Sequence, residues 1–266
     1  MPVPSSVAVR RLAALVLSLC AVPALAAMQA KPVEWTVGQD RFSGVLVYDD
    51  AGGKRPGLVM VPDWKGVTDN AVAKARHVAG KDYVVLVADM YGKDVRPKDD
   101  AEAKAQVQKL YADRGVLRAR AAKALEVLKA QAGTAPLDAD RIAAIGYCFG
   151  GATALELARS GADLDGVVTF HGGLNTTMPA QKGAVKASLL VLNGADDKGT
   201  AGDVAGFEKE MTEAGADWQF VNFSGAVHCF ALPEANNPPG CLYDERATRR
   251  AEAMMRDFLA ERFAAR

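Results

Sequence analysis

Residues 142–151 of the 266-residue chain read Ile-Ala-Ala-Ile-Gly-Tyr-Cys-Phe-Gly-Gly, and this stretch decides the fold. Its apolar start has the length and composition of a buried strand, and apolar residues recur at helical spacing from Gly151 onward. Cys148 therefore stands on a tight turn between a strand and a helix, where a nucleophile elbow carries its serine. Glycine suits positions 146 and 150, because side chains two residues before and after the nucleophile would collide with neighbouring backbone.

The cysteine at this turn has two interpretations. An inert, buried thiol is the ordinary one for a cysteine in an α/β protein. The strand, turn and helix around Cys148 favour a nucleophile instead. The turn points the N-terminus of the following helix at the sulfur, and the positive end of the helix dipole favours a thiolate. We therefore expect Cys148 to ionise more easily than a free cysteine.

The rest of the chain alternates between apolar runs of strand length and longer stretches with helical spacing. Six strands are expected, at Leu58–Val61, Val84–Ala88, Ile142–Ile145, Val167–Phe170, Leu189–Leu192 and Phe220–Phe223. Six helices are expected, at Asn70–Ala79, Ala101–Tyr111, Arg114–Gln131, Gly151–Arg159, Asp203–Ala214 and Asp244–Arg262. This alternation predicts an α/β fold, in which a mostly parallel sheet is buried between helices.

Three further expectations concern the organisation of the chain. Val33–Val37 and Phe42–Tyr48 are β-rich runs joined by a turn, which predicts an antiparallel hairpin ahead of the parallel strands. The longest irregular stretches are expected at Met90–Lys98 and Pro233–Tyr243, after strand ends where open sheets place ligand contacts. One domain is expected over residues 27–266, since α/β domains commonly reach roughly 250 residues.

The first 26 residues have the pattern of a cleaved signal peptide. Arg10 and Arg11 precede an apolar run from Leu12 to Val22, which is shorter than the about 20 residues of a membrane span and is followed by Ala24-Leu25-Ala26. The sequence thus predicts a periplasmic or secreted protein, with no membrane association after cleavage. The 32 basic residues equal the 32 acidic ones, so no positive excess favours nucleic acid as a partner.

A cysteine nucleophile needs a base and an acid that orients the base. Of the three histidines, His77 falls in a helix and is expected at the surface or in helix packing, while His171 ends a strand and is expected in a structural hydrogen-bonding role near the site. His228 follows the last strand, where hydrolases of this order carry their base. Asp196 and Asp197 both follow the penultimate strand; we assign the acid to Asp197 and a turn role to Asp196.

These motifs resemble those of the dienelactone hydrolase family over essentially the whole mature chain. Gly146–Gly151 is similar to the family's elbow, Gly194–Asp197 to its acid element, and His228–Phe230 to its His-x-Phe element. The resemblance implies an α/β-hydrolase fold and a triad of Cys148, Asp197 and His228.

The same resemblance implies roles for other residues. Asp63 stands where the family has an acid that poises the thiol, and the backbone N–H groups of Trp64 and Phe149 stand where it has an oxyanion hole. We assign Tyr91, His171 and Phe230 to a substrate pocket. The founding enzyme of the family has glutamate in place of Asp63, and it has an arginine that binds the substrate carboxylate in place of Leu232, so dienelactone is not the expected substrate.

The activity expected is hydrolysis of a small-molecule ester or lactone through a thioacyl-enzyme intermediate, with no metal and no organic cofactor. The alternatives are a thioesterase or a broad carboxylesterase on the same triad, and a non-catalytic relative that binds a small molecule.

Removal of the signal would leave three cysteines. We expect a Cys229–Cys241 disulfide, which would leave Cys148 reduced and stabilise the chain by roughly 3 kcal/mol. Two unpaired thiols and a Cys148–Cys229 pair are the alternatives.

Overall fold

The computed structural model describes residue 1 and residues 27–265. Eight of its strands form one sheet with the order β1-β2-β4-β3-β5-β6-β7-β8. Apart from Met1, the predicted signal peptide lies outside the described residues. The strands are β1 (Met28–Val37), β2 (Asp40–Asp49), β3 (Arg55–Val61), β4 (Val84–Val87), β5 (Leu137–Tyr147), β6 (Gly166–Phe170), β7 (Ser188–Gly194) and β8 (Trp218–Phe223).

The sheet confirms the predicted α/β-hydrolase architecture. Strands β1 and β2 form the expected antiparallel hairpin, and β2 pairs antiparallel with β4. From β4 through β3, β5, β6 and β7 to β8 every pairing is parallel. Every residue of β4, β6 and β7 is buried, as expected for strands covered on both faces.

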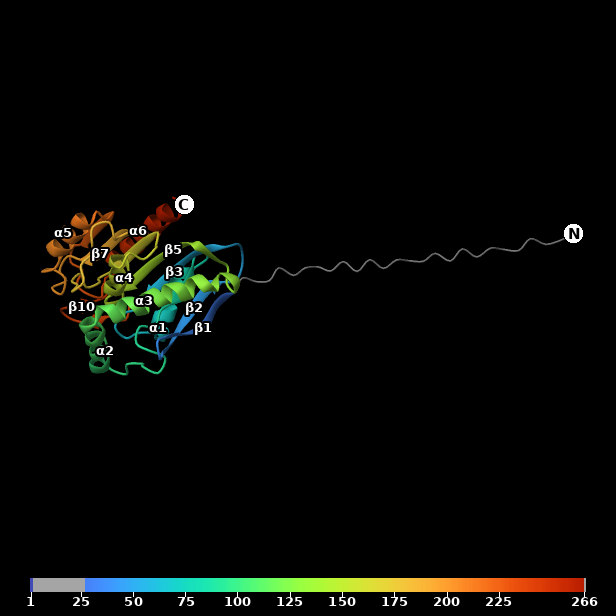
Figure 1. Ribbon diagram of the computed structural model, residues 1–266, viewed down its shortest axis with the longest axis horizontal. Helices are drawn as coiled ribbons and strands as arrows, with labels where there is room; N and C mark the ends of the chain where they lie inside the picture. The colour runs from blue at the N-terminus through green and yellow to red at the C-terminus, as the bar shows by residue number, and fades with distance from the viewer. Residues whose placement is uncertain (2–26, 266) are drawn as a thin grey trace.

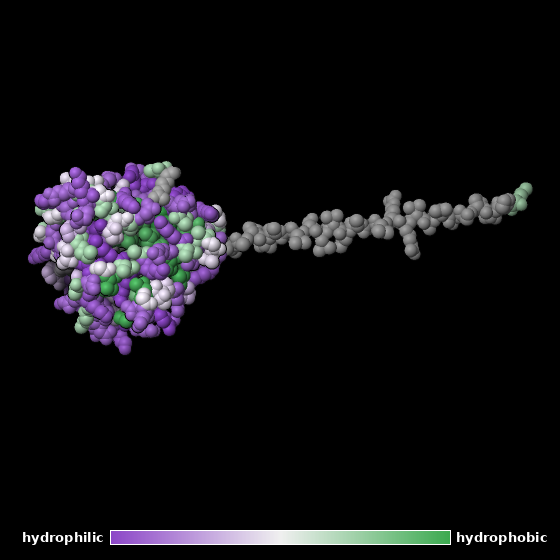
Figure 2. Space-filling view, viewed as in Figure 1, coloured by the Kyte–Doolittle hydropathy of each residue, from purple (hydrophilic) through white to green (hydrophobic). Residues whose placement is uncertain are grey.

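Helices cover both faces of the sheet and bury a separate apolar cluster on each (Figure 1). They are α1 (Asp69–Ala79), α2 (Asp100–Ala112), α3 (Arg114–Lys129), a 3-10 turn η1 (Ala130–Gly133), α4 (Phe149–Arg159), α5 (Val204–Ala214) and α6 (Glu245–Ala264). Helices α1 and α6 contribute to one cluster, and α2 to α5 to the other. The surface is mainly hydrophilic on the side seen in Figure 2. Within residues 27–265 no helix is long and apolar enough to span a membrane.

Two expectations about irregular segments were wrong. The stretch Pro233–Tyr243 contains a two-stranded antiparallel sheet of β9 (Asn236–Asn237) and β10 (Cys241–Leu242). Residues 171–187, between β6 and β7, form a longer irregular segment than residues 90–98. Glycines 172 and 173 and Pro179 favour turns and interrupt regular structure there.

Candidate active site

The turn between β5 and α4 places Cys148 in a conformation that glycine neighbours make possible. Cys148 has a φ of +54°, and its N–H donates to the carbonyl of Phe170 at 3.0 Å. A Cβ atom on Gly146 would lie 2.1 Å from the Gly150 carbonyl oxygen, and one on Gly150 would lie 2.0 Å from that of Val61. These contacts are with backbone and leave no room for any side chain. The structure therefore has the strained elbow that the sequence predicts.

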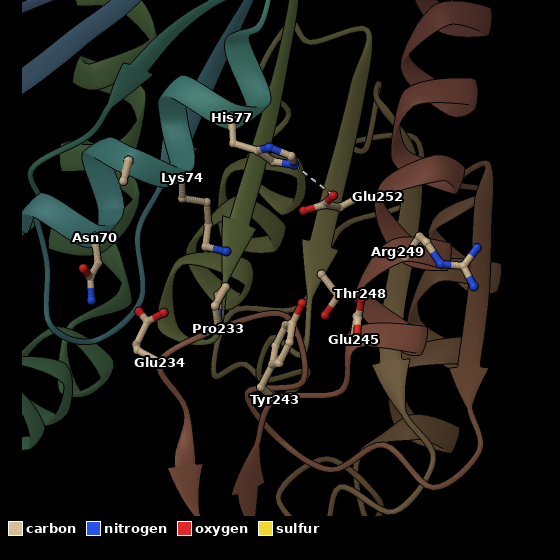
Figure 3. Close-up of a pocket in the computed structure, with 11 residues that line it drawn as sticks. Asn70, Lys74, His77, Pro233, Glu234, Tyr243, Glu245, Thr248, Arg249 and Glu252 are labelled. Carbon is tan, nitrogen blue, oxygen red and sulfur yellow. Dashed lines mark hydrogen bonds and ion pairs between the residues drawn. The ribbon is translucent and has the colours of Figure 1, made fainter.

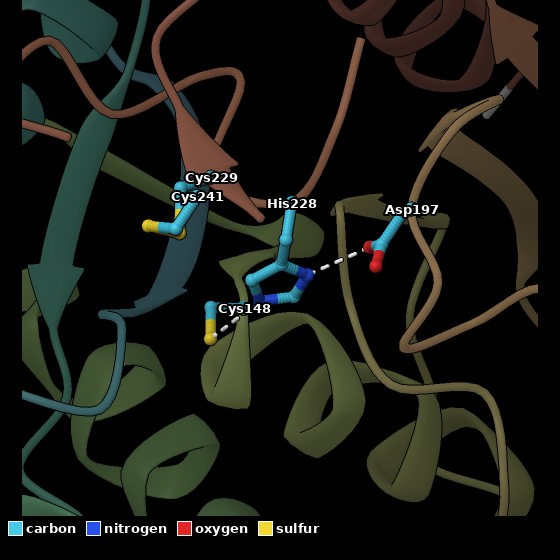
Figure 4. The surroundings of a disulfide bond; sticks show 5 residues. All are labelled: Cys148, Asp197, His228, Cys229 and Cys241. Carbon is cyan, nitrogen blue, oxygen red and sulfur yellow. Dashed lines mark hydrogen bonds and ion pairs between the residues drawn. A yellow bond between two sulfur atoms is a disulfide. The ribbon is translucent and has the colours of Figure 1, made fainter. Parts of the chain in front are cut away.

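A continuous hydrogen-bonded chain joins Cys148 to His228 and Asp197. The Nδ1 atom of His228 lies 2.7 Å from Asp197 Oδ2, and its Nε2 atom lies 3.1 Å from Cys148 Sγ. Figure 4 shows the ring between these two partners. The three residues come from different segments: the elbow, the loop after β7 and the loop after β8. The structure thus brings together the nucleophile, base and acid that were assigned from the sequence.

Burial distinguishes the two adjacent aspartates. Asp197 is 3% exposed, and its second oxygen, Oδ1, accepts from the N–H of Gly199 at 2.8 Å. Asp196 is exposed, and its N–H donates to the carbonyl of Ala226 in the turn. Both Asp197 oxygens are therefore engaged, and one of them orients His228.

The environment of His228 favours the protonated ring. Burial alone would lower its pKa, but the hydrogen bonds to Asp197 and Cys148 and the charges on both partners raise the pKa of His228 to about 10. Both ring nitrogens are then protonated. The ring therefore donates from one nitrogen to the carboxylate and from the other to the sulfur.

Two backbone N–H groups have no hydrogen-bond acceptor among the described residues. They belong to Trp64, which follows β3, and to Phe149, the first residue of α4. The elbow presses against the end of β3, as the close approach of Gly150 to Val61 shows. The end of β3, just before Trp64, and the start of α4 therefore lie against each other, and the oxyanion-hole role of the two N–H groups stays a prediction.

Among the described residues, Asp63 makes no hydrogen bond to the thiol of Cys148, in contrast to the role expected for it. Asp63 instead accepts from the N–H of Lys65 at 2.7 Å, and Cys148 Sγ is bonded to His228. Burial raises the pKa of Asp63, and the backbone bond opposes that effect. The short aspartate side chain turns back onto its own loop, so a thiol-poising contact is not seen.

The three predicted pocket residues support the site rather than line it. His171 and Phe230 have no exposed surface, and the His171 ring packs edge to face on both the His228 ring and the Phe230 ring, at 5.2 Å in each case. Tyr91 is 5% exposed; its hydroxyl donates to the carbonyl of Trp64 at 2.8 Å and its ring stacks on Phe149. A residue without accessible surface cannot contact substrate, so the assignment of His171 and Phe230 to a pocket wall was wrong.

The role expected for His171 also differs from what the structure shows. Only its backbone N–H is bonded, to the carbonyl of Leu192, and neither ring nitrogen has a partner among the described residues. Burial and the nearby charge of His228 lower the pKa of His171 well below its usual value. His171 is therefore a neutral, buried ring under the base. His77, in contrast, lies at the surface as predicted and bonds Glu252.

A mainly apolar depression of about 520 Å³ adjoins the base and acid. Its lining comprises Asp196, Asp197, Lys198, Gly199, Val227, His228, Pro239 and Gly240. A second depression of about 500 Å³ lies between α1 and α6 (Figure 3) and contains neither Cys148 nor His228. Of these two depressions, the first is lined by His228 and Asp197, and Cys148 lines neither.

Sequence reasoning missed one aromatic neighbour of the site. Tyr111, on α2, packs 5.8 Å from the ring of Phe149, and burial followed by the charge of Cys148 raises its pKa. The guanidinium of Arg114 lies over the Tyr111 ring at 3.8 Å. No local pattern marks Tyr111, because its helix reaches the site only through tertiary packing.

Comparisons with known proteins agree with this geometry. A sequence model of the dienelactone hydrolase family matches residues 42–263. The solved structure of a dienelactone hydrolase-like promiscuous phosphotriesterase from metagenomic libraries is 38% identical, with a TM-score of 0.81 over 89% of this chain and 99% of that one. A protein called m3DLH is 37% identical, with a TM-score of 0.82 over the same shares of the two chains.

An uncharacterized protein of Caenorhabditis elegans is 32% identical over 158 residues, which cover 56% of this chain and 96% of that protein. The family match spans the elbow, the acid loop and the base loop. The chain therefore belongs to the dienelactone hydrolase family, whose members are hydrolases that act on ester bonds.

Proposed function

We propose that this protein hydrolyses a small-molecule ester or lactone with Cys148 as nucleophile, His228 as proton carrier and Asp197 as the acid that orients His228. The carrying observation is the continuous chain of hydrogen bonds from Asp197 through His228 to Cys148 Sγ. A nucleophile bonded to a base that is itself bonded to a buried carboxylate is the arrangement of covalent hydrolytic catalysis.

In the first half of the reaction, the Cys148 thiolate attacks the carbonyl carbon and forms a C–S bond. The carbonyl electron pair moves onto oxygen, which the N–H groups of Trp64 and Phe149 stabilise. Collapse of this intermediate breaks the C–O bond of the ester, and the leaving oxygen takes the proton of His228 Nε2. The products of this half are an alcohol and a thioacyl enzyme with a neutral His228.

In the second half, His228 Nε2 takes a proton from water while the water oxygen attacks the thioester carbon. Collapse breaks the C–S bond and releases the carboxylic acid. The thiolate and the protonated His228 are restored together. Asp197 orients the His228 ring throughout by accepting from its Nδ1 atom.

The depression beside His228 supports a substrate with an apolar group of modest size, since Val227 and Pro239 contribute to its wall. We further propose a periplasmic or secreted location, because residues 10–26 have the pattern of a cleaved signal. The Cys229–Cys241 disulfide is consistent with that location, since disulfides persist in oxidising compartments.

A phosphotriester is a second candidate substrate class. The relative that is 38% identical is named a promiscuous phosphotriesterase. The same thiolate and the same two N–H donors could serve attack at phosphorus, where negative charge also develops on an oxygen. Carboxylic esters remain the first proposal, because hydrolysis of a thioacyl intermediate needs only the base already in place.

Native protein and the Cys148→Ala variant should be assayed on p-nitrophenyl acetate, a simple lactone, an acyl thioester and a dialkyl p-nitrophenyl phosphate. His77→Ala is the matched control for His228→Ala, because His77 is a surface histidine that contacts no site residue. We expect loss of turnover in the Cys148 and His228 variants and full turnover in the His77 variant. Full turnover in Cys148→Ala contradicts the cysteine mechanism, and no turnover by the native protein on any ester supports a binding function instead.

A further inference from the structure

The base of the proposed triad is next to a disulfide. Cys229, the residue after His228, is bonded to Cys241 across a separation of 12 residues. Figure 4 shows this bond beside the segment that carries the His228 ring. The prediction of this pairing from the sequence is confirmed, and Cys148 is free. The segment from Cys229 to Cys241 is called the strap loop below.

The backbone of His228 has no helix or long strand to hold it. It follows β8 through the loop of residues 224–227, and its own carbonyl accepts from the N–H of Leu242 at 3.1 Å. An isolated parallel bridge pairs His228 with Cys241. The far end of the strap loop is therefore what positions the backbone of the base.

The near end of the strap loop, beside His228, is anchored to the body of the protein. The carbonyl of Phe230 accepts from the N–H of Asp244 at 3.0 Å and from the hydroxyl of Thr248 at 2.6 Å. Asp244 and Thr248 lie at the start of α6. These bonds hold the start of the strap loop on the N-terminus of a long, packed helix, and the disulfide joins Cys241 to the same start.

Backbone strain at Cys229 indicates that contacts around the segment impose its conformation. Its φ is +65°, in the left-handed region that a non-glycine residue rarely adopts. Such conformations persist where the surrounding structure imposes them, and they cluster at functional sites. Three restraints act at or next to this residue: the disulfide, the bond from the Leu232 N–H to the Cys229 carbonyl at 2.8 Å, and the bond from the Leu242 N–H to the His228 carbonyl.

The strap loop also forms part of the depression beside the base. Pro239 and Gly240 precede Cys241 and line the same depression as His228 and Asp197. Movement of Cys241 away from Cys229 would therefore displace both the base and one wall of the proposed substrate site.

We propose that Cys229 and Cys241 are positioning residues for the reaction: their disulfide holds the His228 ring against Cys148, and hydrolysis requires this bond in its oxidised form. The inference rests on the proposed function of Cys148 and His228. Reduction by a dithiol transfers two electrons and two protons to the disulfide, giving two thiols while the dithiol becomes a cyclic disulfide. The free strap loop then no longer fixes the base.

The decisive variant is the Cys229→Ala/Cys241→Ala double substitution, which removes the disulfide and leaves Cys148 as the one cysteine within residues 27–265. Its kcat and KM on p-nitrophenyl acetate, the ultraviolet absorbance of the Cys148 thiolate and the melting temperature should be compared with those of the native protein. Leu259→Ala is the matched control: Leu259 is fully buried in α6 and far along the chain from the strap loop, so this change lowers stability without touching the base.

At a temperature where all proteins are folded, we expect kcat of the double variant to fall about 10- to 100-fold, because small misplacements of a catalytic group have effects of this size. The thiolate absorbance should fall with it, since a displaced His228 no longer stabilises the thiolate. Native protein treated with a dithiol should lose the same activity and regain it on reoxidation. Leu259→Ala should show a lower melting temperature with unchanged kcat and thiolate absorbance.

A double variant that melts earlier but keeps native kcat and native thiolate absorbance would overturn the inference, because the disulfide would then only stabilise the fold. That result leaves the proposed function intact if Cys148→Ala is inactive. Turnover by Cys148→Ala contradicts the proposed function itself, whatever the double variant does.

Discussion

Replacing Asp197 by asparagine removes the charge from the acid of the proposed triad and keeps the shape of the side chain. In the native protein, one carboxylate oxygen bonds His228 Nδ1 at 2.7 Å and the other accepts from Gly199 N–H at 2.8 Å. An asparagine has one oxygen, so its amide group must face one of these two donors. Either the orientation of His228 or the turn at Gly199 loses its partner.

The magnitude follows from the bond that is lost. A hydrogen bond to a charged group contributes about 1.5–3 kcal/mol, and Asp197 is 3% exposed, so water does not replace it. At 1.36 kcal/mol for each factor of ten, the expected fall in kcat is about 10- to 150-fold. The pKa of His228 should also fall from about 10 toward its ordinary value, because Asp197 is one of the groups that raise it.

Steady-state hydrolysis of a simple alkyl ester at several pH values measures both effects. Asp196→Asn is the matched control, since Asp196 is exposed and adjacent in sequence but does not contact His228. We expect a smaller fall in kcat in the Asp196 variant than in the Asp197 variant, because Asp196 lines the depression beside His228 but does not bond its ring. A larger loss in Asp196→Asn than in Asp197→Asn, or native kcat in Asp197→Asn, would refute the assignment of the acid.

Three other predictions concern the elbow, the buried ring and the pH dependence. Gly150→Ala should lower the free energy of unfolding in urea by at least about 2 kcal/mol, because its Cβ would lie 2.0 Å from a backbone oxygen. Gly133→Ala is the control and should change this free energy little, because no atom lies within 4 Å of its Cβ. Equal effects of the two substitutions would contradict the steric argument. His171→Phe should not lower the melting temperature, since it removes two buried nitrogens without partners; a clear loss would reveal a partner for the ring. Because the pKa of His228 is raised to about 10, the stabilisation from its protonation is complete below pH 6.5 and is lost as the pH rises through about 10. As the pH rises, hydrolysis of an alkyl ester should therefore decline only near pH 10. A decline near pH 6.5 would contradict the ion pair.

The fold could be predicted from the sequence because its signals are local. Apolar runs such as Leu189–Leu192 need burial on both faces, and the alternation of such runs with helical stretches leaves few topologies. The elbow at 146–150 was equally readable, since backbone clashes dictate its glycines. The segment 171–187 was missed because turn residues there are spread over a long connection rather than gathered in one cluster.

The site residues whose place in the fold follows from chain order could be predicted. The hydrogen-bond partners of individual side chains could not. The position of His228 after the last strand followed from fold logic, and the structure joins it to Cys148. Asp63 illustrates the limit. Its carboxylate can accept a hydrogen bond either from the thiol or from its own loop, and the choice depends on the local position of the side chain, which the sequence does not give. The burial of Phe230 is likewise a tertiary property that no local pattern reports.

Covalent trapping tests the central claim most directly. Native protein mixed with an activated ester and quenched in acid within the first turnover should carry one acyl group, and peptide mass mapping should place it on Cys148. The Cys148→Ala variant should carry none, and Asp197→Asn should accumulate the acyl group more slowly. An acyl group found on another residue, or ester turnover by the native protein with no acyl group on Cys148 at any time, would contradict the account.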